Sequence, residues 1–201
     1  MVSDPMRYAA LILLLLIGPA SSAMDSRPRQ ERIILALSGS LAEGDILFRV
    51  GTGIEAEAVR ALNRGGMLSH AGIVLRLHGE WMVVNAEPHA GLVAEPLQRY
   101  LAQDKATGFA LYRLPQANEL RAAVRNGTLR SLKAKIRFDD SFDFSDPSTV
   151  YCTEFVWGVL AEAGAQAKPR LTQLRLPYFS QAIMLPKDLI NSANLIRISD
   201  G

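Results

Sequence analysis

Two side chains of this sequence have the types that a thiol-based hydrolase requires. Cys152 is the only cysteine among 201 residues, and it stands near the start of the segment YCTEFVWGVLAEAG. His70 lies in the apolar segment SHAGIV. An imidazole that takes the proton of a thiol creates a nucleophile for carbonyl carbon. The pair therefore predicts chemistry through a thioester, provided that the fold brings the two side chains together.

A helix is predicted from Cys152 onward, and Gly164 is expected to end it. Two starts are open: Thr149 as the cap, or Asp146 as the cap with Pro147 as the first helical residue. With Thr149 as the cap, Cys152 lies in the first turn, where free N–H groups favour the thiolate. With Asp146 as the cap, the helix start favours the thiolate less. The alternative to a reactive thiol is an inert cysteine in the core. The predicted apolar face consists of Cys152, Phe155, Val156, Val159, Leu160 and Ala163.

His70 is expected on the first strand of a β-hairpin. The predicted strands are Ser69–Leu77 and Trp81–Glu87, with a turn around His78 and Gly79. The face of His70 is the less apolar face of its strand, as the wall of a cleft would be. A strand histidine without a partner thiol is more often structural than catalytic.

The second strand of the hairpin offers two side chains that could orient the imidazole. A loop of two or four residues places His70 opposite Glu87 and Gly72 opposite Asn85, on one shared face. Either Asn85 or Glu87 would then act as the third member of a triad. A loop of odd length would turn both residues to the other face.

The N-terminus has the pattern of a secretory signal. Arg7 precedes an apolar run, Tyr8–Ile17, and the small residues Ser21 and Ala23 follow. The run is about half of the ~20 residues that a membrane span needs. We expect removal of residues 1–23 and an exported protein, periplasmic or secreted, with no stable membrane span in the mature chain. An uncleaved anchor is the alternative.

Composition predicts one globular domain over residues 24–201. Hydrophobic residues make up 49% of the chain and charged residues 21%, and the formal net charge is +2. No basic cluster is interleaved with aromatic residues, so no nucleic-acid partner is expected. His70, His78 and His89 with a single cysteine do not complete a zinc site, and we expect no metal and no cofactor.

Strands and helices alternate irregularly along the chain, which favours the α+β class. EGDILFRV is predicted to be a half-buried strand, ANELRAAVRNG a helix ending at Gly127, and TLRSLKAKI a further helix. FDDSFDFSDPST is predicted to be a solvated loop, with a wall of a substrate cleft as the alternative. LPKDLINSA and NLIRIS are predicted as a closing helix and strand, and Glu31–Leu37 has no assignment.

Four segments in order, EGDILF, SHAGIV, VVNAEP and YCTEFVW, resemble the YiiX-like branch of the permuted papain-like cysteine peptidases, which are related to the NlpC family. The resemblance covers about Gly44 to Ser199 and includes the Pro-led helix and closing strand of the tail. It implies a permuted papain-like fold: an antiparallel sheet with the histidine strand early, and the nucleophile helix late, packed against the sheet.

The same resemblance implies Cys152 as nucleophile and His70 as base. The orienting residue falls on Asn85, where many relatives have Glu in a Glu-Ala pair; Glu87 is kept as the alternative. Asparagine orients a neutral imidazole but supports a thiolate–imidazolium pair less than a carboxylate does.

The sequence thus predicts an exported cysteine hydrolase that cleaves amide bonds, with cell-wall peptides as one class of peptide or acyl substrate. Two alternatives keep the same cleft. One is a lipid or acyl transferase or esterase with the same Cys-His pair, and the other is a binding module with weak turnover. Oligomeric state is not encoded in any pattern of the sequence.

Overall fold

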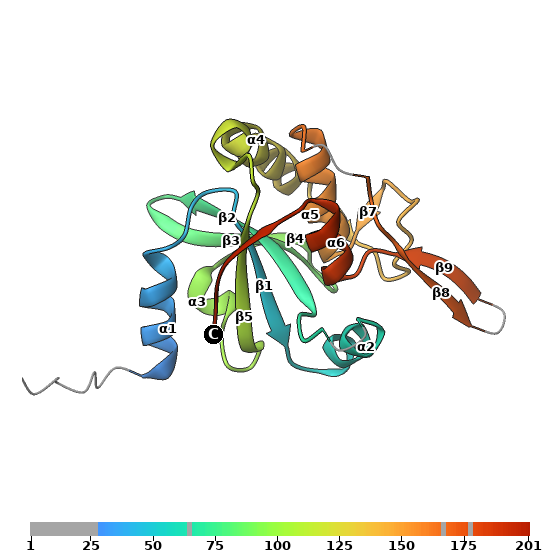
Figure 1. Cartoon of the computed structure of the whole chain (residues 1–201), viewed down its shortest axis with the longest axis horizontal. Helices are drawn as coiled ribbons and strands as arrows, with labels where there is room; N and C mark the ends of the chain where they lie inside the picture. The colour runs from blue at the N-terminus through green and yellow to red at the C-terminus, as the bar shows by residue number, and fades with distance from the viewer. Residues whose placement is uncertain (1–27, 64–65, 166–167, 177–178) are drawn as a thin grey trace, which may run out of the picture.

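A six-stranded sheet forms the centre of the molecule. The computed structural model describes residues 28–63, 66–165, 168–176 and 179–201, so the expected signal segment, 1–23, lies outside them. The strands of this sheet are β1 (Ile46–Gly51), β2 (His70–Leu77), β3 (Glu80–Glu87), β4 (Gly91–Pro96), β5 (Ala106–Arg113) and β10 (Ile196–Asp200). Their order is β10-β5-β1-β2-β3-β4, and every neighbouring pair is antiparallel (Figure 1). The predicted α+β class is confirmed.

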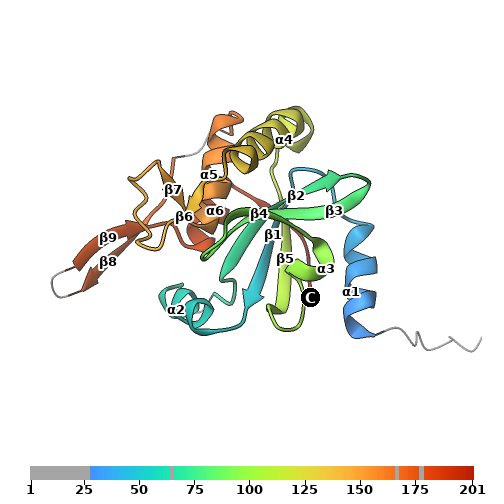
Figure 2. The same cartoon turned by 180° about the vertical axis from the view of Figure 1, so that it is seen from behind.

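Helices cover both faces of the sheet (Figures 1 and 2). The helices are α1 (Arg29–Ser38), α2 (Ile54–Leu62), α3 (Leu97–Tyr100), α4 (Ala117–Ala134), α5 (Cys152–Glu162) and α6 (Pro186–Ser192). One apolar core lies between the sheet and α4, α5 and α6, and a second lies between the sheet and α1 and α3. Helix α2 follows β1 and contributes no buried residue.

Two small sheets lie beside the main one. A parallel pair, β6 (Arg137–Phe138) and β7 (Thr149–Val150), encloses the Asp- and Ser-rich loop. A hairpin of β8 (Thr172–Leu176) and β9 (Phe179–Ile183) extends away from the body of the molecule (Figure 1). Three aspartates order the loop, because each carboxylate accepts the backbone N–H two residues further on, in the pairs Asp139 with Ser141, Asp143 with Ser145, and Asp146 with Ser148.

The hairpin that carries His70 has the predicted register. His78 (φ 51°) and Gly79 (φ 87°) form a two-residue turn between β2 and β3, and two positive φ angles are what a type I′ turn requires. Gly72 therefore lies opposite Asn85.

The structure differs from two of the predictions. Strand β1 is buried on both faces rather than one, because α1 and α3 cover the second face; Leu47 and Arg49 are buried there. The predicted helices on either side of Gly127 are one helix, α4. Gly127 is buried against α5, where an added Cβ would lie 3.4 Å from the Val159 side chain. Close packing of α4 on α5 thus explains why residue 127 is a glycine, although the sequence predicted a helix end there.

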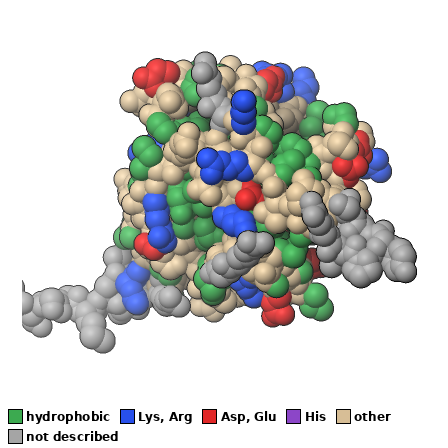
Figure 3. Space-filling model, turned by 45° about the vertical axis from the view of Figure 1, so that its right-hand side comes forward, with side chains coloured by type: hydrophobic (Ala, Val, Ile, Leu, Met, Phe, Trp, Pro, Cys, Tyr) green, Lys and Arg blue, Asp and Glu red, His purple; other side chains and the backbone are tan. Residues whose placement is uncertain are grey.

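Charge is evenly mixed on the surface seen in Figure 3, where Lys and Arg side chains alternate with Asp and Glu. This agrees with the formal net charge of +2. Among the residues that the structure describes, no helix combines the length and the apolar character needed to cross a bilayer.

Gly72 provides a test of the register that places Asn85. A Cβ at residue 72 would lie 2.9 Å from the carbonyl oxygen of Val84 and 3.0 Å from Cβ of Asn85. We expect Gly72→Ala to lower the free energy of unfolding by about 1–3 kcal/mol, because the backbone of β3 must shift. Urea denaturation measures the change.

Gly158→Ala is the matched control, since a Cβ there meets no atom within 4 Å and the residue lies on the exposed side of α5. It should leave stability unchanged or raise it by about 0.5–1 kcal/mol. A Gly72→Ala protein as stable as the wild type would contradict the packing described.

Candidate active site

Cys152 is the first residue of α5, and its two neighbours fix that end of the helix. The Tyr151 hydroxyl accepts a hydrogen bond from the Met184 N–H (2.8 Å), and the Thr153 hydroxyl donates one to the Met184 carbonyl (2.5 Å). Both residues are buried. The start of α5, which carries Cys152, is therefore anchored to the segment that leads into α6.

The helix cap differs from both predicted starts. The N-cap is Tyr151, whose N–H is accepted by the Glu154 carboxylate (3.3 Å). Thr149 belongs to β7, and Asp146 is engaged in its own turn with Ser148. Pairing of β7 with β6 keeps residues 149 and 150 extended, so the helix begins later than the polar residues suggested.

The position of Cys152 at the helix start does not make its side chain a thiolate. Burial raises the pKa of the thiol from 9.0 to about 11, and this outweighs the backbone amide of Ala71 and the Arg49 guanidinium, which lower it. The expected stabilisation by the helix N-terminus is thus overridden by desolvation. Cys152 carries its proton at neutral pH.

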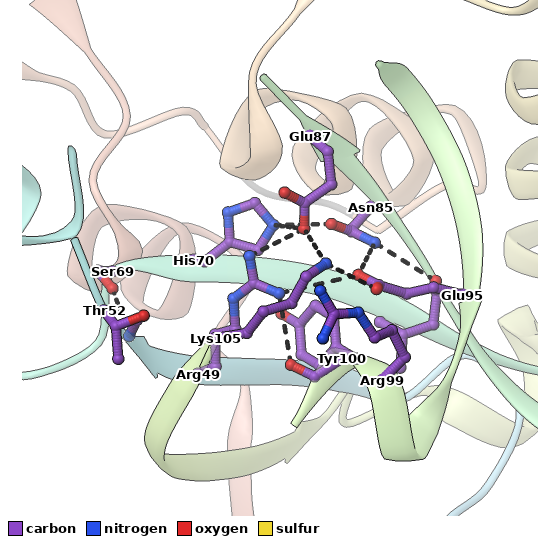
Figure 4. A network of polar contacts seen from close by, with 12 residues as sticks. Arg49, Thr52, Ser69, His70, Asn85, Glu87, Glu95, Arg99, Tyr100 and Lys105 are labelled. Carbon is purple, nitrogen blue, oxygen red and sulfur yellow. Dashed lines mark hydrogen bonds and ion pairs between the residues drawn. The ribbon is translucent and has the colours of Figure 1, made fainter. Parts of the chain in front are cut away.

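His70 contacts one of its two predicted partners by a hydrogen bond. Its Nε2 lies 2.8 Å from Oδ1 of Asn85 and 3.8 Å from Oε1 of Glu87. Figure 4 shows the ring edge turned toward both residues. Asn85 is fully buried, whereas Glu87 is engaged with Arg49 at 2.9 Å.

Glu95 determines which way the Asn85 amide points. The Nδ2 of Asn85 donates to Oε1 of Glu95 (3.2 Å), and a carboxylate can only accept. Oδ1 of Asn85 must then face His70, and Nε2 of His70 must be the donor. In the neutral ring this leaves Nδ1 with the lone pair. The proton-accepting atom of His70 is therefore Nδ1.

A neutralised ion cluster surrounds this hydrogen-bond chain (Figure 4). Lys105 lies 2.7 Å from Glu95 and 3.4 Å from Glu87, and Arg49 bridges to the same two carboxylates at 3.8 Å and 2.9 Å. Arg49 also lies over the ring of Tyr100, 4.7 Å from its centroid. Two cations thus balance two carboxylates in a largely buried place, as buried charges require.

The surroundings keep the imidazole neutral. Burial, followed by the charge of Arg49, lowers the pKa of His70 from 6.5 to about 4, against the opposite effect of Glu87 and the Asn85 hydrogen bond. For Glu87, the cost of burial is outweighed by the charge of the His70 ring when that ring is protonated and by Arg49, and its pKa lies below the ordinary value. A neutral thiol and a neutral imidazole are the resting forms.

Cys152 and His70 line one cavity although they come from opposite sides of the sheet. Side-chain alternation puts His70 on the α3 face, with Gly72 and Val74, whereas α5 packs on the other face. The cavity, of about 450 Å³, lies at the start of β2, where both side chains reach it. Its other polar lining includes Glu87 and Lys105.

The Asp- and Ser-rich loop forms part of the wall of this cavity. Phe138, Asp140 and Phe142 line it. Residues 140, 141, 145, 147 and 148 are exposed, so the loop is solvated, as predicted. It also shapes the cavity, as in the alternative.

Four residues of the site were not singled out from the sequence: Arg49, Glu95, Tyr100 and Lys105. Arg49 and Glu95 carried a usable signal, since each is a charged residue inside an otherwise apolar strand. Tyr100 and Lys105 carried none, because a tyrosine on a short helix and a lysine beyond it are ordinary surface patterns.

Among the described residues, no group of three or more His, Cys, Asp or Glu side chains is arranged to hold a metal ion. Cys152 and His70 belong instead to a site built of one thiol, one imidazole and an amide.

Comparison with known proteins agrees with this architecture. Residues 40–197 match the family described as permuted papain-like amidase enzyme, YaeF/YiiX, C92 family. A crystal structure described as the metalloprotein yiiX from Escherichia coli O157:H7 superimposes with a TM-score of 0.68 and 18% identity, over 81% of this chain and 98% of that one. At this identity the likeness shows the fold alone. The search of curated proteins returned no match.

The lowered pKa of His70 makes stability depend on pH. The folded protein keeps the ring neutral down to about pH 4, whereas the unfolded chain protonates it below about 6.5. Because the unfolded state then binds more protons, the free energy of unfolding falls as pH decreases through that window. The contribution of His70 is on the order of 2–3 kcal/mol.

Urea titrations at several pH values, compared with His70→Gln, isolate this contribution. The variant should lose less stability between pH 6.5 and 4 than the wild type loses. Identical slopes for the two proteins would show that His70 protonates normally in the folded state.

Proposed function

Because the chain belongs to the C92 family of permuted papain-like amidases, we propose that Cys152 and His70 hydrolyse an amide bond through a thioester intermediate. The observation that carries the proposal is one cavity lined by the thiol and by an imidazole whose Nε2 is already held by Asn85. Such an imidazole has Nδ1 available to receive the proton of the thiol.

Acylation follows from the neutral resting forms. Sγ of Cys152 attacks the carbonyl carbon while its proton passes to Nδ1 of His70. The backbone N–H of Cys152, free at the first position of α5, donates to the developing oxyanion. The imidazolium then protonates the leaving amine, the C–N bond breaks, and the acyl group remains on Sγ.

Deacylation uses the same two residues in reverse. His70 takes a proton from water, the hydroxide adds to the thioester carbonyl, and Sγ leaves with the proton that His70 returns. The products are a carboxylic acid, an amine and the free thiol. The positive charge on His70 exists only between the steps, when Asn85 and Glu87 face it at 2.8 and 3.8 Å.

Loss of either reacting group should abolish turnover. We expect Cys152→Ala and His70→Ala to lower kcat/KM for a panel of N-acyl and aminoacyl 4-nitroanilides by at least about 10³-fold. Rapid acid quenching and mass spectrometry of the wild type should show the acyl mass on Cys152.

Circular dichroism confirms that each variant is folded before the rates are compared. Hydrolysis by folded Cys152→Ala at the wild-type rate would exclude the thioester route. A stable acyl-enzyme that water never releases would favour transfer to another acceptor instead of hydrolysis.

We propose that Asn85 and Glu95 are positioning residues. The dependence of kcat and kcat/KM on pH distinguishes the effects of substitutions at the two positions. Asn85→Asp replaces the amide by a carboxylate at His70, which favours the imidazolium, so the acid limb of kcat/KM should move to higher pH. Glu95→Gln replaces an acceptor-only carboxylate with an amide that can also donate, so the Asn85 amide is no longer fixed, and kcat should fall about tenfold because the wrong tautomer of His70 becomes accessible.

His89→Ala is the matched control, because His89 lines the same cavity without a hydrogen bond to the His70 chain. It should leave the acid limb in place. An unchanged acid limb in Asn85→Asp would remove Asn85 from the proposed chain of positioning residues.

A further inference from the structure

Ser69 stands directly before His70 and lines the cavity together with Cys152. A neighbouring cavity at the start of α5 is also lined by Ser69 and Cys152, whereas His70 does not line it. The cavity that holds both reacting groups has two hydroxyl side chains in its wall, those of Thr52 and Ser69. Of these two, only the hydroxyl of Ser69 accompanies the thiol in both cavities. Ser69 therefore lies beside the nucleophile and not only beside the base.

The hydrogen bonds of Ser69 leave its hydroxyl proton unused. Oγ accepts the N–H of Gly51 at 2.8 Å, and Ser69 is only 5% exposed. A serine hydroxyl has one proton to donate. Among the described residues, no hydrogen bond uses Oγ of Ser69 as a donor. Because buried donors normally have an acceptor, an acceptor that belongs to the substrate would complete this site.

Thr52 shows that this feature is specific to Ser69. The Thr52 hydroxyl donates to the carbonyl oxygen of Asp104 at 2.6 Å, and Thr52 is exposed. Its proton is therefore already used. In the view of Figure 4, Thr52 and Ser69 both lie apart from the ion cluster. Thr52 thus provides a control hydroxyl in the wall of the same cavity.

The position of the Ser69 hydroxyl depends on Gly51. A Cβ at residue 51 would lie 2.8 Å from Oγ of Ser69 and 3.0 Å from Cβ of Ala56. Any side chain there would displace the hydroxyl or push α2 away. The bare backbone of Gly51 and the hydrogen bond from its N–H hold Oγ in one place, which is what a preorganised donor requires.

The mechanism described above gives the oxyanion one donor, the backbone N–H of Cys152. Oxyanion holes combine such backbone groups with side-chain donors, hydroxyls included. We propose that the hydroxyl of Ser69 is a second donor to the oxyanion in acylation and in deacylation, an assignment that rests on the proposed function. The proton stays on Oγ throughout. Its hydrogen bond strengthens as negative charge develops on the carbonyl oxygen, and no covalent bond to Ser69 forms or breaks.

The two cations of the site are not available for this task, because each is already paired. Arg49 lies 2.9 Å from Glu87, and Lys105 lies 2.7 Å from Glu95. Attack by a neutral thiol creates the oxyanion and the imidazolium together, so the intermediate has no net charge of its own. An uncharged donor such as a hydroxyl stabilises the oxyanion without disturbing that balance.

Removal of the hydroxyl should act on the transition state. We expect Ser69→Ala to lower kcat for the 4-nitroanilides by about 10²-fold and to change KM by less than about twofold. Thr52→Ala, the matched control, should leave kcat unchanged. Ser69→Thr keeps the hydroxyl and should retain most of the wild-type kcat, which separates loss of the donor from a change of size. An unchanged kcat in folded Ser69→Ala would overturn the proposal.

A change of one substrate atom distinguishes a donor from a residue that only supports the backbone of Gly51. A thionoester places sulfur, a weak hydrogen-bond acceptor, where the oxyanion forms. The ratio of kcat/KM between wild type and Ser69→Ala should be about 10² for N-acetylglycine ethyl ester and below about 3 for its thionoester. An equal loss with both substrates would show that Ser69 is structural.

Two reagents for Cys152 test the donor without turnover. N-acetylglycinal adds Sγ to its carbonyl carbon, and the thiol proton passes through His70 to the oxygen, which then occupies the oxyanion position. Iodoacetamide alkylates Sγ and releases iodide without forming an oxyanion. Ser69→Ala should raise the Kd of the aldehyde by about tenfold and leave the rate of alkylation unchanged.

The aldehyde separates failure of the donor from failure of the proposed function. If the aldehyde binds more weakly to Ser69→Ala and the wild type hydrolyses no amide or ester, the proposed hydrolysis fails and the donor stands. If the wild type hydrolyses its substrates and the aldehyde binds equally to both proteins, the donor fails and the hydrolase stands.

Discussion

The orientation of one buried amide decides the chemistry of this site. Asn85 lies between Glu95, which only accepts hydrogen bonds, and His70, which must therefore donate from Nε2. That single constraint fixes the tautomer and leaves the lone pair of the neutral ring on Nδ1. The three residues sit on adjacent strands, β2, β3 and β4, so the register of the sheet is what sets the protonation pattern of the imidazole.

The charges around that amide are arranged to support a neutral pair. Arg49 disfavours the imidazolium and lowers the cost of the thiolate, whereas Glu87 acts in the opposite sense on both groups. Lys105 and Arg49 balance Glu87 and Glu95, so these four side chains together carry no net charge. In the proposed mechanism the thiol proton therefore moves during attack and not before it, which an asparagine in the third position suits better than a carboxylate does.

Much of the site could be predicted from the sequence because local rules applied there. The turn residues His78 and Gly79 fixed the hairpin, and the hairpin put Asn85 and Glu87 on the face of His70. The family assignment followed from short motifs in order, and the α+β class followed from the irregular alternation of strands and helices. The choice between Asn85 and Glu87 was open in the sequence. Coordinates were needed to show that Asn85 contacts His70, whereas Arg49, 21 residues before His70, engages Glu87.

Elsewhere the sequence rules gave the wrong answer where tertiary contacts outweigh local preference. Gly127 reads as a helix end, but packing against Val159 keeps α4 continuous. Thr149 and Asp146 are good caps, but strand pairing and a local turn use both of them. Desolvation of Cys152 exceeds the helix-start effect that its position predicts. The β8–β9 hairpin and α1 were not assigned at all, since neither has a strong turn or cap signal.

Helix α2 has an evolutionary consequence. Because none of its residues enters either core, replacing its outward apolar side chains costs the fold little. Selection can therefore alter what this helix offers to a ligand without first acquiring stabilising changes elsewhere. Substitutions along these nine residues can therefore reshape the wall of the cavity while the sheet, the thiol and the imidazole stay unchanged.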